Sequence, residues 1–231
     1  MRQDIGYLYD IDIMLHSVNY KSLQIQLSFI VDGYNHQREY FQWEETGDEE
    51  HIEVEDRRIK FLGTEFMKHR SMIKTTTAIP WSDFYFETSL TNLGSNSVAI
   101  GLTTHIPGTR SLRFPGKIPK TIGLAVDDKS SELYHGGPSL FEEGIDPVSS
   151  HDILGCKVEL IECDRARHRL CSFTINGNPA GTPCYLEDVQ LFPSIMINSP
   201  GAILDTNFGE KRFYHDPKGI YCKQHRNVIT Y

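Results

Sequence analysis

Residues 191–209 read LFPSIMINSPGAILDTNFG, and they are the most informative part of the sequence about the fold. Two short runs rich in β-branched, aliphatic and aromatic residues, Phe192–Ile197 and Ile203–Phe208, flank the triplet Ser199-Pro200-Gly201. Proline presets φ for a tight turn and glycine accepts a positive φ, so this triplet reverses the chain. The stretch therefore predicts two strands joined by a tight turn.

Two further hairpins are indicated by their turn residues. Asn176-Gly177 follows the apolar run that ends at Ile175, and Asp32-Gly33 follows the alternating run Leu23–Val31. Asn-Gly and Asp-Gly tolerate the positive φ angles of a two-residue type I′ turn, whose twist matches that of the flanking strands.

Short runs of this kind recur about every ten residues along the chain, which is typical of a sandwich or barrel. Helix is compatible with the sequence only in short pieces, such as around Leu186–Val189. The remaining strands are predicted near Tyr34–Trp43, Ile59–Leu62, Met72–Thr77, Phe84–Leu90, Val98–Thr103, Ile122–Val126, Ile153–Ile161 and Leu170–Ile175. The fold class is all-β. The large residues of these runs are expected to form the core, namely Phe84, Phe86, Ile100, Phe173, Ile175, Phe192, Ile195 and Phe208.

The order of motifs resembles that of the SPRY domain family, over roughly residues 55–214. The motifs are RRIKFLG (57–63), MIKTTTAIP (72–80), FYFETSL (84–90), VAIGLTT (98–104), ELYHGG (132–137), ILGC (153–156), CSFTINGNPAG (171–181) and the stretch 191–209. The sequence departs from the family pattern at Lys117, where the family usually has Trp, and at Lys129, where it often has Gly. The resemblance implies a two-sheet antiparallel β-sandwich of the concanavalin-like jelly-roll type.

The resemblance also implies a non-enzymatic module that binds a protein or peptide segment through loops at one end of the sandwich. Such modules often recruit substrates or act as adaptors in ubiquitin-ligase and signalling assemblies. By analogy, the contacting residues would be Lys68, His69, Arg70, Arg110, Arg113, Lys117, Asn198, Ser199 and Pro200. Arginine is favoured here because its planar fork of donors is common at binding hot spots. A carbohydrate-binding sandwich of the lectin type stays open as an alternative.

Composition narrows the class of protein further. The chain carries a formal net charge of −8, and 39% of its residues are hydrophobic. Such a composition suits a globular protein rather than a disordered one. No apolar run approaches the roughly 20 residues of a membrane span, and the acids near the N-terminus do not suit a signal peptide. The cysteines include no C-x-x-C pair and do not suggest a secreted disulfide framework. We therefore expect an intracellular protein located in the cytoplasm, and the nucleus remains an alternative location.

Both ends of the chain differ from its middle. In the run Trp43–Asp56, eight of fourteen residues are Asp or Glu. Such a run indicates a solvated linker or an acidic docking segment. The predicted division is an N-terminal extension with a hairpin and acidic linker (1–50), a SPRY domain (51–214) and a basic C-terminal tail (215–231).

Sequence motifs for catalysis, cofactors and metals are not found. There is no nucleophile elbow, phosphate loop, dinucleotide fingerprint or H-E-x-x-H sequence. Cys156, Cys163, Cys171 and the nearby histidines lack the tight spacing of zinc ligands, and Cys171 shares a strand face with Phe173, which suggests a core thiol. The chain is acidic overall and no aromatic RNA-stacking signature accompanies the basic stretch Arg110–Lys120, so nucleic acid is not the expected partner. The expectation is no enzyme, no cofactor, no metal and no membrane.

Overall fold

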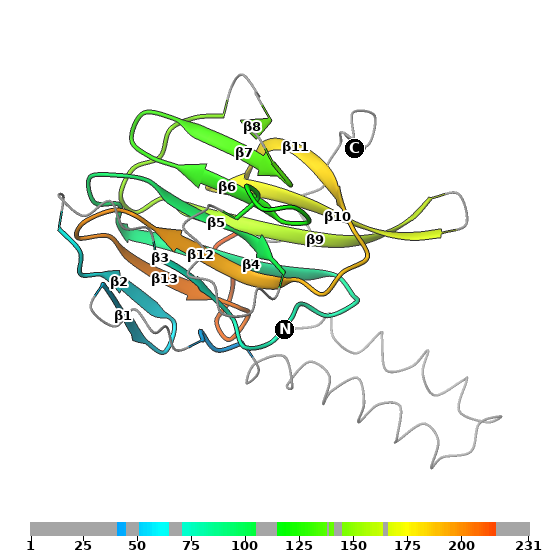
Figure 1. The fold of residues 1–231 in the computed structure, drawn as a ribbon, viewed down its shortest axis with the longest axis horizontal. Coiled ribbons are helices and arrows are strands. Elements are labelled where there is room, and N and C mark those ends of the chain that lie inside the picture. The colour runs from blue at the N-terminus through cyan, green and yellow to red at the C-terminus, as the bar shows by residue number, and fades with distance from the viewer. Residues whose placement is uncertain are drawn as a thin grey trace, which may run out of the picture. The chain divides into compact units, whose positions relative to one another are not determined.

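The computed structural model describes residues 41–44, 51–64, 71–104, 115–137, 139–140, 145–163 and 166–215. Within these ranges the chain forms thirteen strands and no helix, and every strand pairing is antiparallel (Figure 1). The seven-stranded sheet has the order β1 (Ile52–Glu55), β2 (Arg58–Phe61), β13 (Ile203–Asn207), β4 (Phe84–Asn92), β9 (Ile153–Cys163), β10 (Ala166–Ile175) and β11 (Asn178–Leu186).

The six-stranded sheet has the order β3 (Ser71–Lys74), β12 (Phe192–Ile197), β5 (Val98–Thr103), β6 (Ile122–Val126), β7 (Ser131–His135) and β8 (Ser139–Leu140). The two sheets pack face to face, because side chains from both of them enter one shared apolar cluster. Alternation along each strand supplies this inner face, as in other sandwiches. The predicted all-β sandwich is confirmed.

The core lies between the two sheets. On β4, Phe86 and Leu90 are fully buried, and on β5, Ile100 and Leu102 are fully buried. Each such side chain contributes on the order of 1.5–3 kcal/mol through burial. The predicted core residues in this cluster are Phe84, Phe86, Ile100, Phe173, Ile195 and Phe208, with Ile175 at its margin.

Phe192 was expected in the same core, but it faces the other way. Ile195 and Ile197 point inward from β12. Strand alternation then sends Phe192 to the opposite face. There the Lys74 Nζ atom lies 4.8 Å from the centroid of the Phe192 ring.

The turn chemistry expected between β10 and β11 is present. Asn176 and Gly177 have φ angles of 51° and 77°. Both values are positive, as a type I′ turn requires. No helix forms around Leu186–Val189, where the sequence allowed a short one. The carbonyl groups of Glu187 and Val189 accept hydrogen bonds from the Arg169 side chain instead of from helical amides.

The acidic run Trp43–Asp56 is more ordered than a linker where the structure describes it. Trp43 is buried and bridges to Thr75, and Ile52–Glu55 form the edge strand β1. The predicted hairpin around Asp32-Gly33 lies outside the described residues.

Candidate functional site

The predicted contact residues that the structure describes lie at two ends of the six-stranded sheet. Ile197 pairs with Val98, so Asn198–Pro200 leave the sheet at the β12 C-terminus. Phe192 pairs with Thr103 at the other end, where the loop that contains Lys117 leads into β6. The register therefore does not bring Lys117 together with Asn198–Pro200. The other predicted residues lie outside the described ranges, namely Lys68, His69, Arg70, Arg110 and Arg113.

Ser199 joins two loops of the sandwich. Its side chain is fully buried, and its hydroxyl donates to the Leu93 carbonyl at 2.5 Å and accepts from the Asn96 amide at 2.9 Å. A partner at this end would meet the partly exposed Asn198 and Pro200 first.

Lys117 lies at the opposite end, on a loop held close to the outer face of the six-stranded sheet. The Nζ atom of Lys117 is 4.2 Å from the ring centroid of Tyr134, whose hydroxyl donates to Glu132. This cation–π contact gives Lys117 an aromatic platform at the position where the SPRY pattern usually has Trp. The loop is tightened further by a hydrogen bond from the Gly116 amide to Thr121 Oγ1 at 2.8 Å.

An exposed aromatic side chain that sequence reasoning missed lies at this same end. Trp81 is 58% exposed, although it is a large apolar residue, and its ring lies 4.0 Å from the guanidinium carbon of Arg169. Arg169 is only 3% exposed and donates to the carbonyls of Glu187 and Val189 at 2.8 and 2.6 Å. Burial lowers the pKa of Arg169. The guanidinium still stays charged at neutral pH, because its ordinary pKa is so high.

An ion pair joins the neighbourhood of Trp81 to the loop that leads into β6. We call Arg169, the Trp81 ring and the two carbonyls that Arg169 binds the Arg169 cluster. The Glu187 carboxylate pairs with Lys120 Nζ at 3.0 Å, which connects this cluster with the loop before β6. We call the residues Trp81, Lys117, Lys120 and Glu187 the Trp81 surface. One sequence signal for it was Trp81 itself, since this tryptophan falls directly after Pro80 and before the β4 run. That position is a connection, where side chains reach the surface.

His135 lies at the same end of the sheet, because it pairs with Ile122. Burial lowers the pKa of His135 below its ordinary value, and the Glu187 carboxylate partly opposes this effect. As the pH decreases below about 6.5, His135 therefore binds a proton more readily in the unfolded chain than in the folded chain. The free energy of unfolding then decreases as the pH is lowered. We expect His135→Gln to flatten this acid-side decrease, measured by urea unfolding between about pH 7.5 and 5.5. Parallel curves for the two proteins across this range would contradict the assignment.

The described residues do not bring three or more His, Cys, Asp or Glu side chains together as a metal site would require. Cys171 is buried, as predicted, and its Sγ atom lies 3.8 Å from Cys156 Sγ. Burial raises the pKa of the Cys171 thiol. This is the behaviour of a core cysteine rather than of a nucleophile. In the described part of the chain, no helix is long and apolar enough to cross a membrane.

Comparison with known proteins agrees with this architecture. No family model matches the chain. Ran-binding protein 9 of Xenopus tropicalis is 30% identical over 170 residues, which are 70% of this chain and 28% of that protein. Ran-binding protein 10 of Danio rerio is 29% identical over 157 residues, which are 64% of this chain and 23% of that protein. The chain thus spans about a quarter of the length of these curated relatives.

Comparison with solved structures shows the class of fold to which the sandwich belongs. A human SPRY domain has a TM-score of 0.54 and 22% identity, and the match covers 70% of this chain and 98% of that one. The TRIM65 PSpry domain has a TM-score of 0.53 and 16% identity, covering 77% of this chain and 95% of that one. The protein is therefore a two-sheet antiparallel sandwich with its connections gathered at the ends. Its sandwich has the fold of SPRY domains, as the sequence motifs predicted.

Proposed function

We propose that this protein is an interaction module that captures a segment of a partner protein at the Trp81 surface. The observation that carries the proposal is the exposed Trp81 ring held against a buried arginine. Tryptophan and arginine are the residue types most enriched at binding hot spots, and a large exposed aromatic is otherwise costly to leave in water.

The Trp81 surface is prepared for binding in the free protein. The two hydrogen bonds from Arg169 to backbone carbonyls fix the guanidinium, and the guanidinium supports the indole ring. A side chain already held in one orientation loses little conformational freedom when a partner binds, so more of the contact energy appears as affinity. Lys117 lies over Tyr134 and Lys120 pairs with Glu187 at the same end of the six-stranded sheet, and these two basic groups favour polar or acidic segments.

The predicted contacts Arg110 and Arg113 belong to the basic stretch Arg110–Lys120, which also contains Lys117 and Lys120. We therefore include Arg110 and Arg113 among the proposed contact residues. From the SPRY resemblance, we further propose that capture serves partner selection within a larger assembly, such as a ubiquitin ligase or a signalling scaffold. The related Ran-binding proteins are several times longer than the matched segment, which is in keeping with a module that works beside other domains.

Partner capture should depend on the exposed indole. We expect Trp81→Ala to weaken binding of captured proteins about thirtyfold or more, since a hot-spot tryptophan is worth about 2 kcal/mol or more. The experiment compares proteins recovered from cell extract by wild type, by Trp81→Ala and by the Arg70/Arg110/Arg113 triple alanine variant, with quantitative mass spectrometry.

Tyr214→Ala provides the matched control. Tyr214 is an exposed aromatic (77%), and its amide is bonded to Glu87 on β4 rather than to the Arg169 cluster. The control should recover the same proteins as wild type. Extract pretreated with glycosidases should also give the same set, because the proposed ligand is polypeptide rather than carbohydrate. Identical recovery by wild type and Trp81→Ala would show that the partner does not use the Trp81 surface, and identical recovery by the triple variant would show that Arg70, Arg110 and Arg113 are not contacts.

A further inference from the structure

Strand β1 lies at the margin of the seven-stranded sheet (Figure 1). Among the described residues it pairs with β2 alone, in the register Ile52 to Phe61 and Glu55 to Arg58. An edge strand presents unpaired amide and carbonyl groups that can pair with another chain. The edge is part of the acidic run, which the proposed function above leaves without a role.

The register shows which backbone groups face the open side. The Leu62 amide donates to the His51 carbonyl at 2.8 Å, so these two residues form a hydrogen-bonded pair. Hydrogen-bonded and non-hydrogen-bonded pairs alternate along an antiparallel ladder. Glu53 and Glu55 therefore direct their backbone groups toward β2, whereas Ile52 and Val54 direct theirs toward the open edge.

The side chains of β1 alternate in the same way. Ile52 is buried in the core and Val54 packs partly against it, whereas Glu53 and Glu55 lie exposed on the outer face. A strand added beside β1 would therefore place one set of side chains against acids and the other set against the apolar margin of the core.

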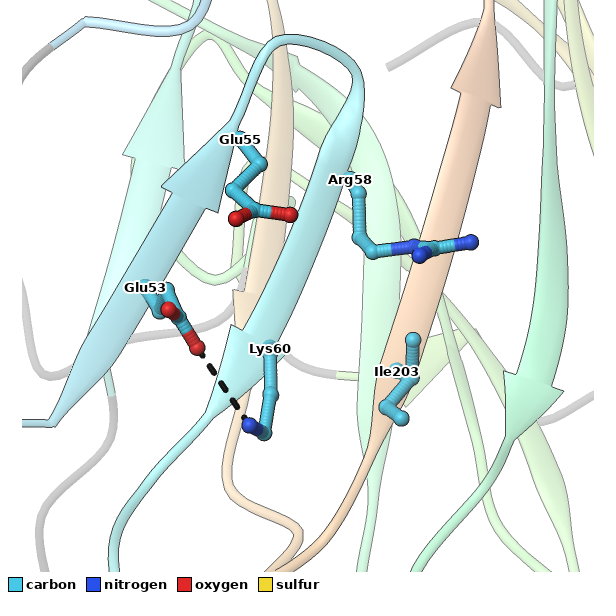
Figure 2. Close-up of a pocket in the computed structure, with 5 residues that line it drawn as sticks. All are labelled: Glu53, Glu55, Arg58, Lys60 and Ile203. Atoms are coloured by element: carbon cyan, nitrogen blue, oxygen red, sulfur yellow. Dashed lines mark ion pairs between the residues drawn. The ribbon is translucent and has the colours of Figure 1, made fainter.

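The charged side chains on the outer face differ in whether they have an ion-pair partner. Lys60 Nζ pairs with Glu53 at 3.3 Å, and Arg58 forms two contacts with Asp205, at 3.1 and 3.3 Å. Glu55 is opposite Arg58 in the register, yet the Arg58 guanidinium points toward β13 (Figure 2). Within the described part of the chain, Glu55 is thus left without a cation.

A shallow hollow opens beside this carboxylate. It has a volume of about 260 Å³ and is lined by Glu53, Glu55, Arg58, Lys60 and Ile203 (Figure 2). A long basic side chain that crosses β1 on its outer face could place its charged group near Glu55.

We propose that the β1 edge binds an extended segment of a partner protein as an added strand, in which Lys or Arg alternates with apolar residues. The Val54 and Ile52 backbone groups supply the hydrogen bonds, and Glu55 selects the basic face, because Glu53 already pairs with Lys60. This mode of recognition combines main-chain affinity with side-chain specificity on alternate residues. The site is separate from the Trp81 surface and requires its own partner segment.

The test uses the full chain and a synthetic peptide of about eight residues that alternates lysine with valine. Binding is measured by fluorescence anisotropy, and backbone protection by hydrogen exchange. We expect the amides of Ile52 and Val54 to gain protection, because an added strand would take up their outward hydrogen bonds. A peptide with glutamate in place of lysine should not bind.

Two variants separate strand pairing from charge attraction. Val54→Pro removes an outward amide without removing a bond to β2, and proline is tolerated on the open side of an edge strand. It should weaken peptide binding about tenfold, while Glu55→Lys should weaken it about fivefold by placing like charges opposite each other. Glu162→Lys makes the same charge change at an exposed position on β9. This control should leave affinity within about twofold of wild type.

Several results would overturn the proposal. One is that the wild-type protein does not bind the peptide, which would mean that the acids only protect the edge from aggregation. Another is that Glu55→Lys and Glu162→Lys lose equal peptide affinity. Binding without protection of Ile52 and Val54 would also overturn it, even if Val54→Pro failed to fold. Trp81→Ala should bind the peptide normally, so failure of this proposal and failure of the Trp81 surface are distinguishable.

Discussion

A chain that begins at His51 is expected to be unfolded, whereas a chain that begins at Phe41 is expected to keep the sandwich. Phe41 and Trp43 are only 3% and 6% exposed, and both pack in the main core. The Phe41 ring lies 4.9 Å from Phe84 and 5.2 Å from Phe208, and Trp43 lies 5.4 Å from Phe208. The segment also bonds to the β3 end, since the Glu44 amide donates to the Lys74 carbonyl at 2.8 Å.

The expected loss is large compared with the stability of a typical domain. Removing a buried aromatic side chain costs about 3–5 kcal/mol, and a domain has roughly 5–15 kcal/mol in total. Circular dichroism and thermal unfolding of the two truncated chains would measure the difference. Trp43→Ala in the full chain should lower the free energy of unfolding by about half as much as the truncation to His51 does. Equal melting temperatures for the two truncations would place the start of the sandwich at or after His51.

Gly101→Ala is expected to destabilise the protein by about 3 kcal/mol, because two strands and a loop meet at this glycine. Gly101 on β5 pairs with Gly123 on β6, and Pro115 lies against both. A Cβ atom at position 101 would contact the Ile122 carbonyl oxygen and lie 2.7 Å from Gly123 Cα. Both are backbone atoms within a sheet, so they cannot move away cheaply.

Gly137→Ala is the matched control for this prediction. A Cβ atom at position 137 would have nothing within 4 Å. The same chemical change should therefore alter the free energy of unfolding by no more than about 0.5 kcal/mol. Urea unfolding of the two variants measures both effects. A loss in Gly137→Ala as large as that in Gly101→Ala would show that space around the Cβ atom is not the cause.

Much of the fold was predictable because its signals are local. Asn176-Gly177 predicted the β10–β11 turn from two adjacent residues, and the structure gives both a positive φ. The two apolar runs and the turn triplet in residues 191–209 predicted β12 and β13 with nearly their observed bounds. The resemblance to SPRY domains used the same local strings, and comparison with a solved SPRY domain confirmed the fold that it implies.

The candidate site was less predictable, because it depends on which strands become neighbours. Lys117 and Asn198–Pro200 were predicted on one surface, but the pairing of β12 with β5 separates them to opposite ends of a sheet. Trp81 stands beside Arg169 only because the connection before β4 meets the one after β11. No local pattern reports such contacts between residues so far apart in the chain.

The acidic run shows the same division within a single segment. Its composition was enough to predict exposed negative charge, and Glu53 and Glu55 are exposed. That Ile52–Glu55 is a sheet edge follows only from its register with β2 and from the inward packing of Ile52. Turn chemistry and alternation act between neighbouring residues and are therefore written in the sequence. Register and strand order are set by the burial of distant side chains against one another, and only the folded chain shows them.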